Sequence, residues 1–185
     1  MSYLKEKYNN EVISQMIEDL GYKNKMEVPR LEKVVINCGF GRLISGKTKE
    51  EQHKIQEAIA KDLTEICGQK AIITKARKSI ASFKIRQGQE IGCKITLRRQ
   101  RMYDFLERVI LIVLPRSRDF NGIAVSGIDE SGNLTFGIKE HIAFPEIMPE
   151  KIRFIFSFEI TVVTTAKNHT EGLALFKHLG FPLKS

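Results

Sequence analysis

Cysteine, proline and tryptophan are scarce in this sequence. Its 185 residues include no tryptophan, five prolines and three cysteines, Cys38, Cys67 and Cys93. Three cysteines spaced this far apart fit neither a disulfide framework nor a zinc knuckle, so we expect buried free thiols in a reducing compartment. The four histidines do not pair with cysteines or acids at metal-ligand spacing, and we expect them at the surface or on helices. These absences argue against a metal centre and against a disulfide-stapled secreted domain.

Long apolar runs are also missing. No stretch of about 18 consecutive apolar residues occurs, so no segment is expected to span a membrane. The N-terminus, MSYLKEKYNNEV, is charged and lacks the apolar core of a secretory signal. With 185 residues and 42% hydrophobic content, the chain is long enough to bury one core, or at most two small ones.

Acidic residues are almost absent from one segment. From Lys70 to Arg101 the chain has ten basic residues and a single acid, Glu90, so this segment of 32 residues carries a net charge of +9, whereas the whole chain carries +8. Such a concentration of charge is typical of a surface that binds a polyanion. Nucleic acid is favoured over an anionic membrane surface, because the segment has β-type alternation and no exposed aromatic stripe.

Four segments have apolar residues at the three- and four-residue steps of an amphipathic helix. The expected helices are residues 3–20, a segment from Thr48 to Gly68, residues 101–114, and a segment that Asn168 and Glu171 cap and Gly180 ends. Thr48 and Glu51 stand in capping-box spacing. Pro115 is expected to end the third helix.

Alternating apolar residues predict strands in the remaining segments. They are expected at residues 31–38, from Ile72 onward, at 91–98 and at 152–163, with a further short strand near 83–85. Asp129 to Asn133 is a candidate hairpin turn between short strands. Phe154, Phe156 and Phe158 alternate along the last strand. A base-stacking platform is one interpretation, but a buried core strand is favoured because the inward positions are all apolar.

The order of these elements predicts one α+β domain over residues 1–185. Helices and strands do not alternate as a parallel sheet requires. We therefore expect a largely antiparallel, twisted sheet with helices packed on one face.

Two strands are predicted to carry polar and basic residues on the face opposite their apolar one. The inward set is Val34, Ile36 and Cys38 in the first strand and Ile91, Cys93, Ile95 and Leu97 in the other. The opposite set is Leu31, Lys33, Val35 and Asn37, and Gly92, Lys94, Thr96 and Arg98. A sheet face with cations and an asparagine amide could bind RNA, and a simple solvated face is the alternative. The segment TKARKSIASFKIRQGQE has clustered charge and few strong apolar positions, so we expect a protruding loop there.

Gly41 to Thr48 fits the phosphate-binding pattern G-x-x-x-x-G-K-[ST] between a predicted strand and a predicted helix. In a nucleotide hydrolase, Lys47 would reach the terminal phosphates and Thr48 would hold Mg²⁺. However, no apolar strand ends in an aspartate suited to the metal, and the strand and helix order does not suit a parallel nucleotide-binding sheet. A solvated loop is the plainer interpretation, and a small P-loop NTPase is kept as the alternative function.

Several longer segments closely resemble ribosomal protein five of the bacterial large subunit, a family also found in organelles descended from bacteria. They are VPRLEKVVIN (28–37), GQKAIITKARKSIASFKIRQGQEIGCKITLRRQRMYDFL (68–106), LPRSRDF (114–120), GIKEHIAFPEI (137–147), VVTTA (162–166) and the ending LGFPLKS. The match extends from about Leu4 to the C-terminus. It departs from the family pattern at GFGRLISGKTKEEQ, which is longer and more basic than the usual family loop and contains the phosphate-binding pattern.

The resemblance implies a structural protein with no catalytic activity, no cofactor and no metal. It implies an α+β domain with a twisted antiparallel sheet that binds 5S rRNA in the central protuberance of the large subunit, with 23S rRNA as a second RNA partner. The ribosome would be that of a bacterial cytoplasm or of an organelle. The implied rRNA-binding residues are Lys33, Asn37, Arg86, Lys94, Thr96, Arg98, Arg99 and Arg101.

The resemblance also implies two further partners, neither of them a membrane. In the family, the loop matching Thr74 to Phe83 reaches toward the peptidyl-site tRNA. The residues expected to contact that tRNA are Lys75, Arg77, Lys78, Ser79 and Lys84. A region near residues 110–146 would form a bridge to small-subunit ribosomal protein thirteen.

Overall fold

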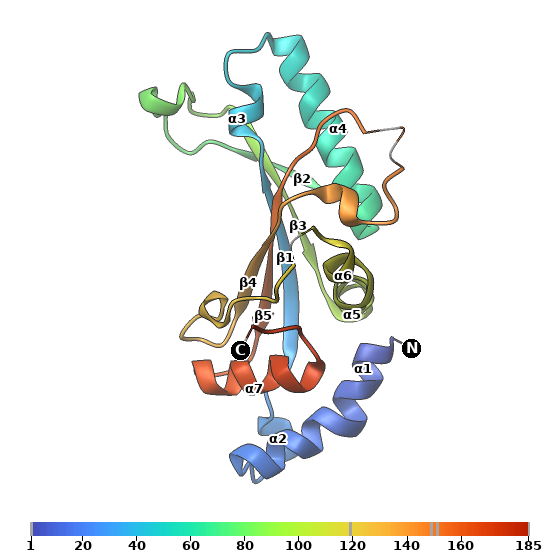
Figure 1. Cartoon of the computed structure of the whole chain (residues 1–185). Helices are drawn as coiled ribbons and strands as arrows, with labels where there is room; N and C mark the ends of the chain where they lie inside the picture. Colours follow the sequence, from blue (N-terminus) through green and yellow to red (C-terminus); the bar gives the residue numbers. More distant parts are fainter. Residues whose placement is uncertain (1, 119, 149, 151, 185) are drawn as a thin grey trace. The chain divides into compact units, whose positions relative to one another are not determined.

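The structure is a computed structural model that describes residues 2–118, 120–148, 150 and 152–184. The fold is α+β, as predicted, with a five-stranded antiparallel sheet in the order β2-β3-β1-β5-β4 (Figure 1). The strands are β1 (Leu31–Gly39), β2 (Ile72–Lys75), β3 (Glu90–Leu97), β4 (Leu134–Ile138) and β5 (Phe158–Thr164).

The chain forms two compact units. The first comprises Met1–Val34, Leu97–Phe136 and Ile160–Ser185, and the second comprises Val35–Thr96 and Gly137–Glu159. The expectation of a single domain over residues 1–185 stays a prediction.

In the first unit, the predicted N-terminal helix is one continuous helical segment. It comprises α1 (Tyr3–Lys7), a π-helical turn η1 (Tyr8–Val12) and α2 (Ile13–Leu20). Leu4, Tyr8, Val12 and Met16 are buried at four-residue steps, as the apolar periodicity predicts. Gly21 ends the segment with a φ of 70°, a conformation that glycine adopts without the steric cost of a Cβ atom.

Two further helical segments belong to this unit. One comprises α5 (Arg99–Arg108), η4 (Val109–Val113) and α6 (Leu114–Arg116), and the other is α7 (His169–Leu179). Asn168 caps α7 by accepting a hydrogen bond from the Glu171 N–H at 2.8 Å, as predicted. The prediction that Pro115 ends its helix is wrong. The fixed φ of proline is compatible with helical backbone, so the chain stays helical to Arg116.

The predicted turn before β4 is present in the first unit. The Asp129 N–H donates to the Asn133 carbonyl at 2.9 Å, and Asp129 Oδ1 accepts from the Asn133 N–H at 2.8 Å. The strand expected before the turn is reduced to an isolated bridge at Ile128. A Cβ atom on Gly172 of α7 would lie 2.5 Å from the Cα of Gly132, so the turn and the helix approach each other through two glycines.

In the second unit, helix α4 (Lys49–Cys67) begins and ends where it was predicted. Thr48 Oγ1 accepts from the Glu51 N–H, and Glu51 Oε2 accepts from the Thr48 N–H at 3.0 Å, which completes the capping box. The predicted apolar stripe is buried and consists of Ile55, Ile59, Leu63 and Ile66. Gly68 ends the helix with a φ of 64°, and a short helix, α3 (Gly41–Ile44), precedes it.

The strand predicted near residues 83–85 is wrong. The segment forms a 3-10 turn, η3 (Ala81–Phe83), and Lys84 then adopts a left-handed φ of 53°. A residue in that conformation interrupts an extended chain.

The strand predicted over residues 152–163 is only half present, since β5 begins at Phe158. The preceding residues pair with a loop, because the Phe156 carbonyl accepts from the His141 N–H at 3.2 Å. Phe156 and Phe158 are each 4% exposed, which confirms the core interpretation for these two side chains. Phe154 is half-buried.

Short 3-10 turns also occur at η2 (Lys25–Glu27), η5 (Val125–Gly127) and η6 (His141–Ala143). Within the described ranges, no helix is both long enough and apolar enough to cross a membrane.

Candidate nucleic-acid interface

In the second unit, strands β1 and β3 bury one face and expose the other. The Cys38 and Cys93 side chains are fully buried and joined by a hydrogen bond. Asn37 and Lys94, their immediate neighbours in sequence, are exposed. Because side chains of a strand alternate between faces, the predicted division into a buried and an exposed face is confirmed for this part of both strands.

The buried thiols show how closely the two strands pack. The side-chain hydrogen bond with Cys93, together with burial, raises the pKa of Cys38, which therefore stays protonated. Cys38 also contacts the Ser157 carbonyl at 3.4 Å. A Cβ atom on Gly92 would lie 2.8 Å from the Cys38 carbonyl oxygen, so glycine is required at this approach. The expectation of buried thiols is confirmed for all three cysteines.

The exposed side of these strands offers a neutral amide beside a cation. Among the described residues, Asn37 has no hydrogen-bond partner for its side chain, so two N–H donors and a carbonyl oxygen are available to a ligand. Lys94 likewise forms no ion pair with any described residue. Thr96 is half-buried, and its carbonyl accepts from Gln69 Nε2 at 3.0 Å, which anchors the strand to the loop after α4.

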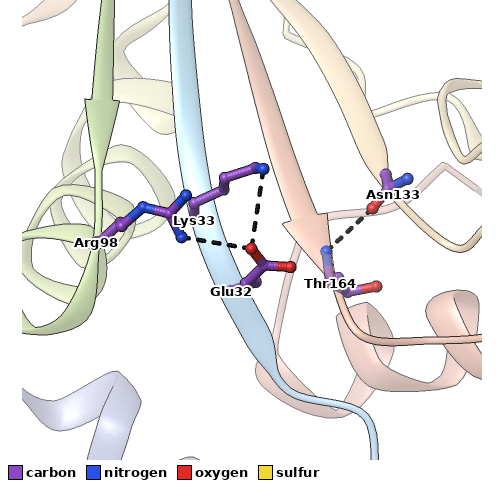
Figure 2. Close-up of polar contacts among 5 residues, drawn as sticks. All are labelled: Glu32, Lys33, Arg98, Asn133 and Thr164. Carbon is purple, nitrogen blue, oxygen red and sulfur yellow. Dashed lines mark hydrogen bonds and ion pairs between the residues drawn. The ribbon is translucent and has the colours of Figure 1, made fainter.

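The first unit holds Lys33 and Arg98, and an acid joins them. Glu32 Oε1 lies 3.3 Å from Arg98 Nη1 and 3.8 Å from Lys33 Nζ (Figure 2). Glu32 is not among the residues predicted from the sequence. Strict alternation would place it on the buried face, whereas its side chain is 45% exposed.

The start of β1 explains this difference. Leu31, predicted to lie on the polar face, is 5% exposed, so the two-residue alternation begins only at Val34. The N-terminal helix contacts the chain here, because the Tyr8 hydroxyl donates to the carbonyl of buried Pro29 at 3.0 Å. Packing against a helix, in addition to the pleat of the sheet, decides which side chains are covered at this end.

Arg99 and Arg101 are exposed in the first turn of α5, in the same unit as Arg98. Arg99 has a φ of 53°, in the left-handed region. That conformation costs an L-amino acid roughly 1–2 kcal/mol. Strained backbone of this kind is concentrated at functional sites, so the corner from β3 into α5 is consistent with a binding role.

The loop between β2 and β3 protrudes from the second unit, as predicted (Figure 1). It is a hydrogen-bonded hairpin: the Ala76 N–H donates to the Gln89 carbonyl at 2.8 Å, and Ile80 and Ile85 exchange two backbone hydrogen bonds. Ser79 Oγ accepts from the Gln87 N–H at 2.9 Å. The Ser79 hydroxyl therefore stabilises the loop itself, and its proton and its second lone pair remain available to a ligand.

Most of the predicted RNA-contacting cations are unpaired. Of the ten predicted cations, six are exposed and form no ion pair with a described residue, namely Arg77, Lys78, Lys84, Arg86, Lys94 and Arg99. Lys75 is the exception in the loop, since its Nζ lies 3.8 Å from Glu90 Oε1. Sequence reasoning also missed Phe83, an apolar side chain that is 62% exposed at the loop tip.

The segment Gly41 to Thr48 does not form a phosphate-binding loop. Its first four residues are helix α3, and the Thr48 hydroxyl is engaged with Glu51, its Oγ1 lying 3.0 Å from Glu51 Oε2. The Lys47 carbonyl accepts from Gln52 Nε2 at 2.8 Å. In addition, the sheet is antiparallel, whereas nucleotide-binding folds of this motif need a parallel sheet. The segment serves as the connection that caps α4.

His141 corrects the expectation that the histidines lie at the surface. It is fully buried and stacks on Phe156, with ring centroids 4.1 Å apart. The Phe156 N–H points to His141 Nδ1 at 3.5 Å, and His141 Nε2 lies 3.9 Å from Asp62 Oδ2. Burial lowers the pKa of His141 and raises the pKa of Asp62. The apolar residues that follow His141 in the sequence HIAF are the signal from which its burial could have been predicted.

No group of three or more His, Cys, Asp or Glu side chains capable of holding a metal ion occurs in the described part of the chain.

Comparison with known proteins identifies the family. A model of ribosomal protein L5 matches residues 24–86, and a model of the C-terminus of the ribosomal L5 family matches residues 90–183. The chain belongs to the ribosomal protein L5 family. The large ribosomal subunit protein uL5 of Trichlorobacter lovleyi is 50% identical over 185 residues, covering 100% of both chains. Those of Geobacter sulfurreducens and Dichelobacter nodosus are 49% and 50% identical over 184 residues, covering 100% of this chain and 99% of theirs.

The two L5 matches divide the candidate interface between them. The first includes Lys33, Asn37 and nearly the whole β2–β3 loop, and the second begins at Glu90 and includes Lys94 and Arg98. The resemblance inferred from the sequence is thus confirmed. L5 is a family of ribosomal proteins and not of nucleotide hydrolases, which agrees with the structure of the Gly41 to Thr48 segment.

Proposed function

We propose that this chain is a structural constituent of the large ribosomal subunit that binds 5S rRNA in the central protuberance and also contacts 23S rRNA. It acts in translation as part of a ribonucleoprotein, in a bacterial or organellar ribosome, and catalyses no reaction. The β2–β3 loop contacts the peptidyl-site tRNA, and the region near 110–146 forms a bridge to small-subunit ribosomal protein thirteen. Support comes from membership of the L5 family and from relatives named as large-subunit proteins.

The observation that carries the RNA-binding proposal is the exposed side of β1 and β3 in the second unit. It combines an unpaired cation, Lys94, with an unpaired amide, Asn37, directly beside the buried Cys38 and Cys93 pair. Phosphate contacts by cations supply affinity and carry little sequence information. The neutral amide can read a 2′-hydroxyl or a base edge, which is how folded RNA is distinguished.

The loop suits a second polyanion because it is already ordered. Its internal hydrogen bonds at Ala76, Ser79 and Ile80 fix the backbone, so little backbone entropy is lost when Arg77 and Lys78 meet tRNA phosphates. The proposed bridge has apolar surface available in the first unit, where Leu111 is 58% and Ile112 38% exposed.

The test is a titration of the purified protein against 5S rRNA, with tRNA as competitor, at low and high salt. If about six cations contact phosphates, affinity falls about a thousandfold between 50 and 200 mM salt. Binding to 5S rRNA that survives the competitor and follows this steep salt dependence supports the proposal. Binding that tRNA abolishes would show that the basic surface is unspecific and would refute a dedicated 5S rRNA site.

A further inference from the structure

Glu32 is an acid placed among cations of the proposed RNA surface. A single oxygen, Oε1, contacts both Arg98 Nη1 at 3.3 Å and Lys33 Nζ at 3.8 Å. Figure 2 shows the second oxygen directed away from both cations. Among the described residues, this second oxygen has no hydrogen-bond or ion-pair partner.

The ion pairs of Glu32 with Arg98 and Lys33 are expected to contribute little to folding stability. The side chains of Glu32, Arg98 and Lys33 are 45%, 54% and 31% exposed. Ion pairs exposed to this degree contribute little to the free energy of unfolding, because water and salt screen them. The main physical consequence of Glu32 therefore falls on whatever binds beside Lys33 and Arg98.

A carboxylate has two opposite effects on a bound RNA. It repels phosphate groups, so an RNA that places its backbone at Glu32 is disfavoured. It also accepts hydrogen bonds and donates none when ionised, so it suits the 2′-hydroxyl of a ribose or the amino and imino groups of a base edge. An RNA whose fold presents such a donor at Glu32 avoids the repulsion and gains a charge-assisted hydrogen bond.

We infer that Glu32 is a specificity-determining residue of the RNA surface, which accepts a hydrogen bond from a neutral donor of the cognate RNA and rejects RNAs that place a phosphate there. This inference rests on the proposed binding of 5S rRNA. Lys33 and Arg98 supply attraction to any polyanion, and Glu32 makes that attraction conditional on the orientation of the RNA.

The test compares Glu32→Gln with wild type for two RNAs, 5S rRNA and a scrambled RNA of the same length, across a salt series. The glutamine side chain is nearly the same size as glutamate but uncharged, so the variant removes the repulsion and weakens the accepted hydrogen bond. Glu18→Gln is the matched control, because Glu18 is an exposed acid on α2, outside the proposed surface. Thermal unfolding of each variant checks that folding is unchanged.

We expect Glu32→Gln to bind the scrambled RNA about threefold more tightly, since one repulsive charge is removed from the phosphate contacts. We expect its affinity for 5S rRNA to fall about threefold to fivefold, because a charge-assisted hydrogen bond becomes a neutral one. The ratio of the two affinities then falls about tenfold, whereas Glu18→Gln leaves it unchanged.

Two results would overturn the inference. If both RNAs bind more tightly by the same factor, Glu32 is only a charge on the surface, and if both bind more weakly by the same factor, it merely positions Arg98. A wild-type protein that does not prefer 5S rRNA would instead refute the proposed function, so the two failures are distinguishable.

In a second arm, 5S rRNA transcribed with inosine in place of guanosine lacks the guanine amino group. Loss of the Glu32 effect with this RNA assigns the donor to guanine, and its persistence assigns it to another donor such as a 2′-hydroxyl.

Discussion

The Asn37→Ala substitution removes an exposed amide from β1 and leaves the buried face of the strand untouched. Because the amide has no hydrogen-bond partner among the described residues, its loss breaks no hydrogen bond with them, and we expect folding to be unaffected. If the amide meets a polar RNA group that binding buries, truncation leaves that group unsatisfied, at a cost of about 1–3 kcal/mol. This corresponds to about a 5- to 150-fold weaker affinity for 5S rRNA.

Substitution of the neighbouring cation, Lys94, provides the comparison for this prediction. Lys94→Ala is expected to weaken binding to 5S rRNA and to a scrambled RNA alike, and to reduce the slope of log affinity against log salt by about 0.7–0.9. Asn37→Ala is expected to weaken 5S rRNA binding selectively and to leave that slope unchanged. Fluorescence titrations at several salt concentrations measure both quantities, with Asn121→Ala as a control at another exposed asparagine. Unchanged affinity in Asn37→Ala, or an equal loss for both RNAs, would refute the assignment of Asn37 to specific recognition.

Three further predictions concern the loop, the turn on α7 and the buried histidine. Neutralising Lys75, Arg77 and Lys78 together should weaken tRNA binding while nearly preserving 5S rRNA binding, and a large loss of 5S rRNA affinity would show that the loop serves that RNA instead. Gly172→Ala should lower the unfolding free energy by about 1–3 kcal/mol, since the added Cβ would lie 2.5 Å from the Gly132 Cα and the backbone would have to shift. Gly39→Ala, which meets open space, should be nearly neutral, and equal melting temperatures for the two variants would contradict the close approach. Burial lowers the pKa of His141 in the folded state, so below pH 6.5 the unfolded chain binds more protons than the folded chain, and the free energy of unfolding should decrease there. Denaturant titrations across this pH range should show a smaller decrease in His141→Phe than in wild type. An unaltered pH dependence would exclude a role for His141.

Local signals explain which parts of the fold could be predicted. The capping box at Thr48 and Glu51 and the cap at Asn168 depend on side chains within three residues of each other, and the structure contains both. The exposed positions of Asn37 and Lys94 follow from the two-residue period of a strand, which acts wherever the sheet alone decides burial. The family resemblance added the classes of partner, and the roles of these residues stay predictions.

Contacts between segments that are distant in the sequence explain why some of the predictions from the sequence were wrong. Leu31 is buried where the Tyr8 hydroxyl ties the N-terminal helix to Pro29, 21 residues away in the chain. His141 is buried by Phe156, and the same pairing keeps the chain before Phe158 out of the sheet. In both cases the contacting residue lies more than ten residues away in the chain. The periodicity of a short window therefore predicted the type of element correctly, but it predicted the limits of the last strand and the buried face of the first strand wrongly.

The phosphate-binding pattern at Gly41 to Thr48 shows the same distinction in a functional motif. The pattern specifies glycines, a lysine and a hydroxyl, but the chemistry also requires the hydroxyl to be free for a metal ion. Here the Glu51 carboxylate, three residues further on, contacts the Thr48 hydroxyl at 3.0 Å and converts it into a helix cap. A carboxylate at that position competes with the metal for Thr48, so residues just outside a motif can decide whether it performs its chemistry. Glu32 is the parallel case on the proposed RNA surface, where an acid next to Lys33 changes what the neighbouring cations can bind.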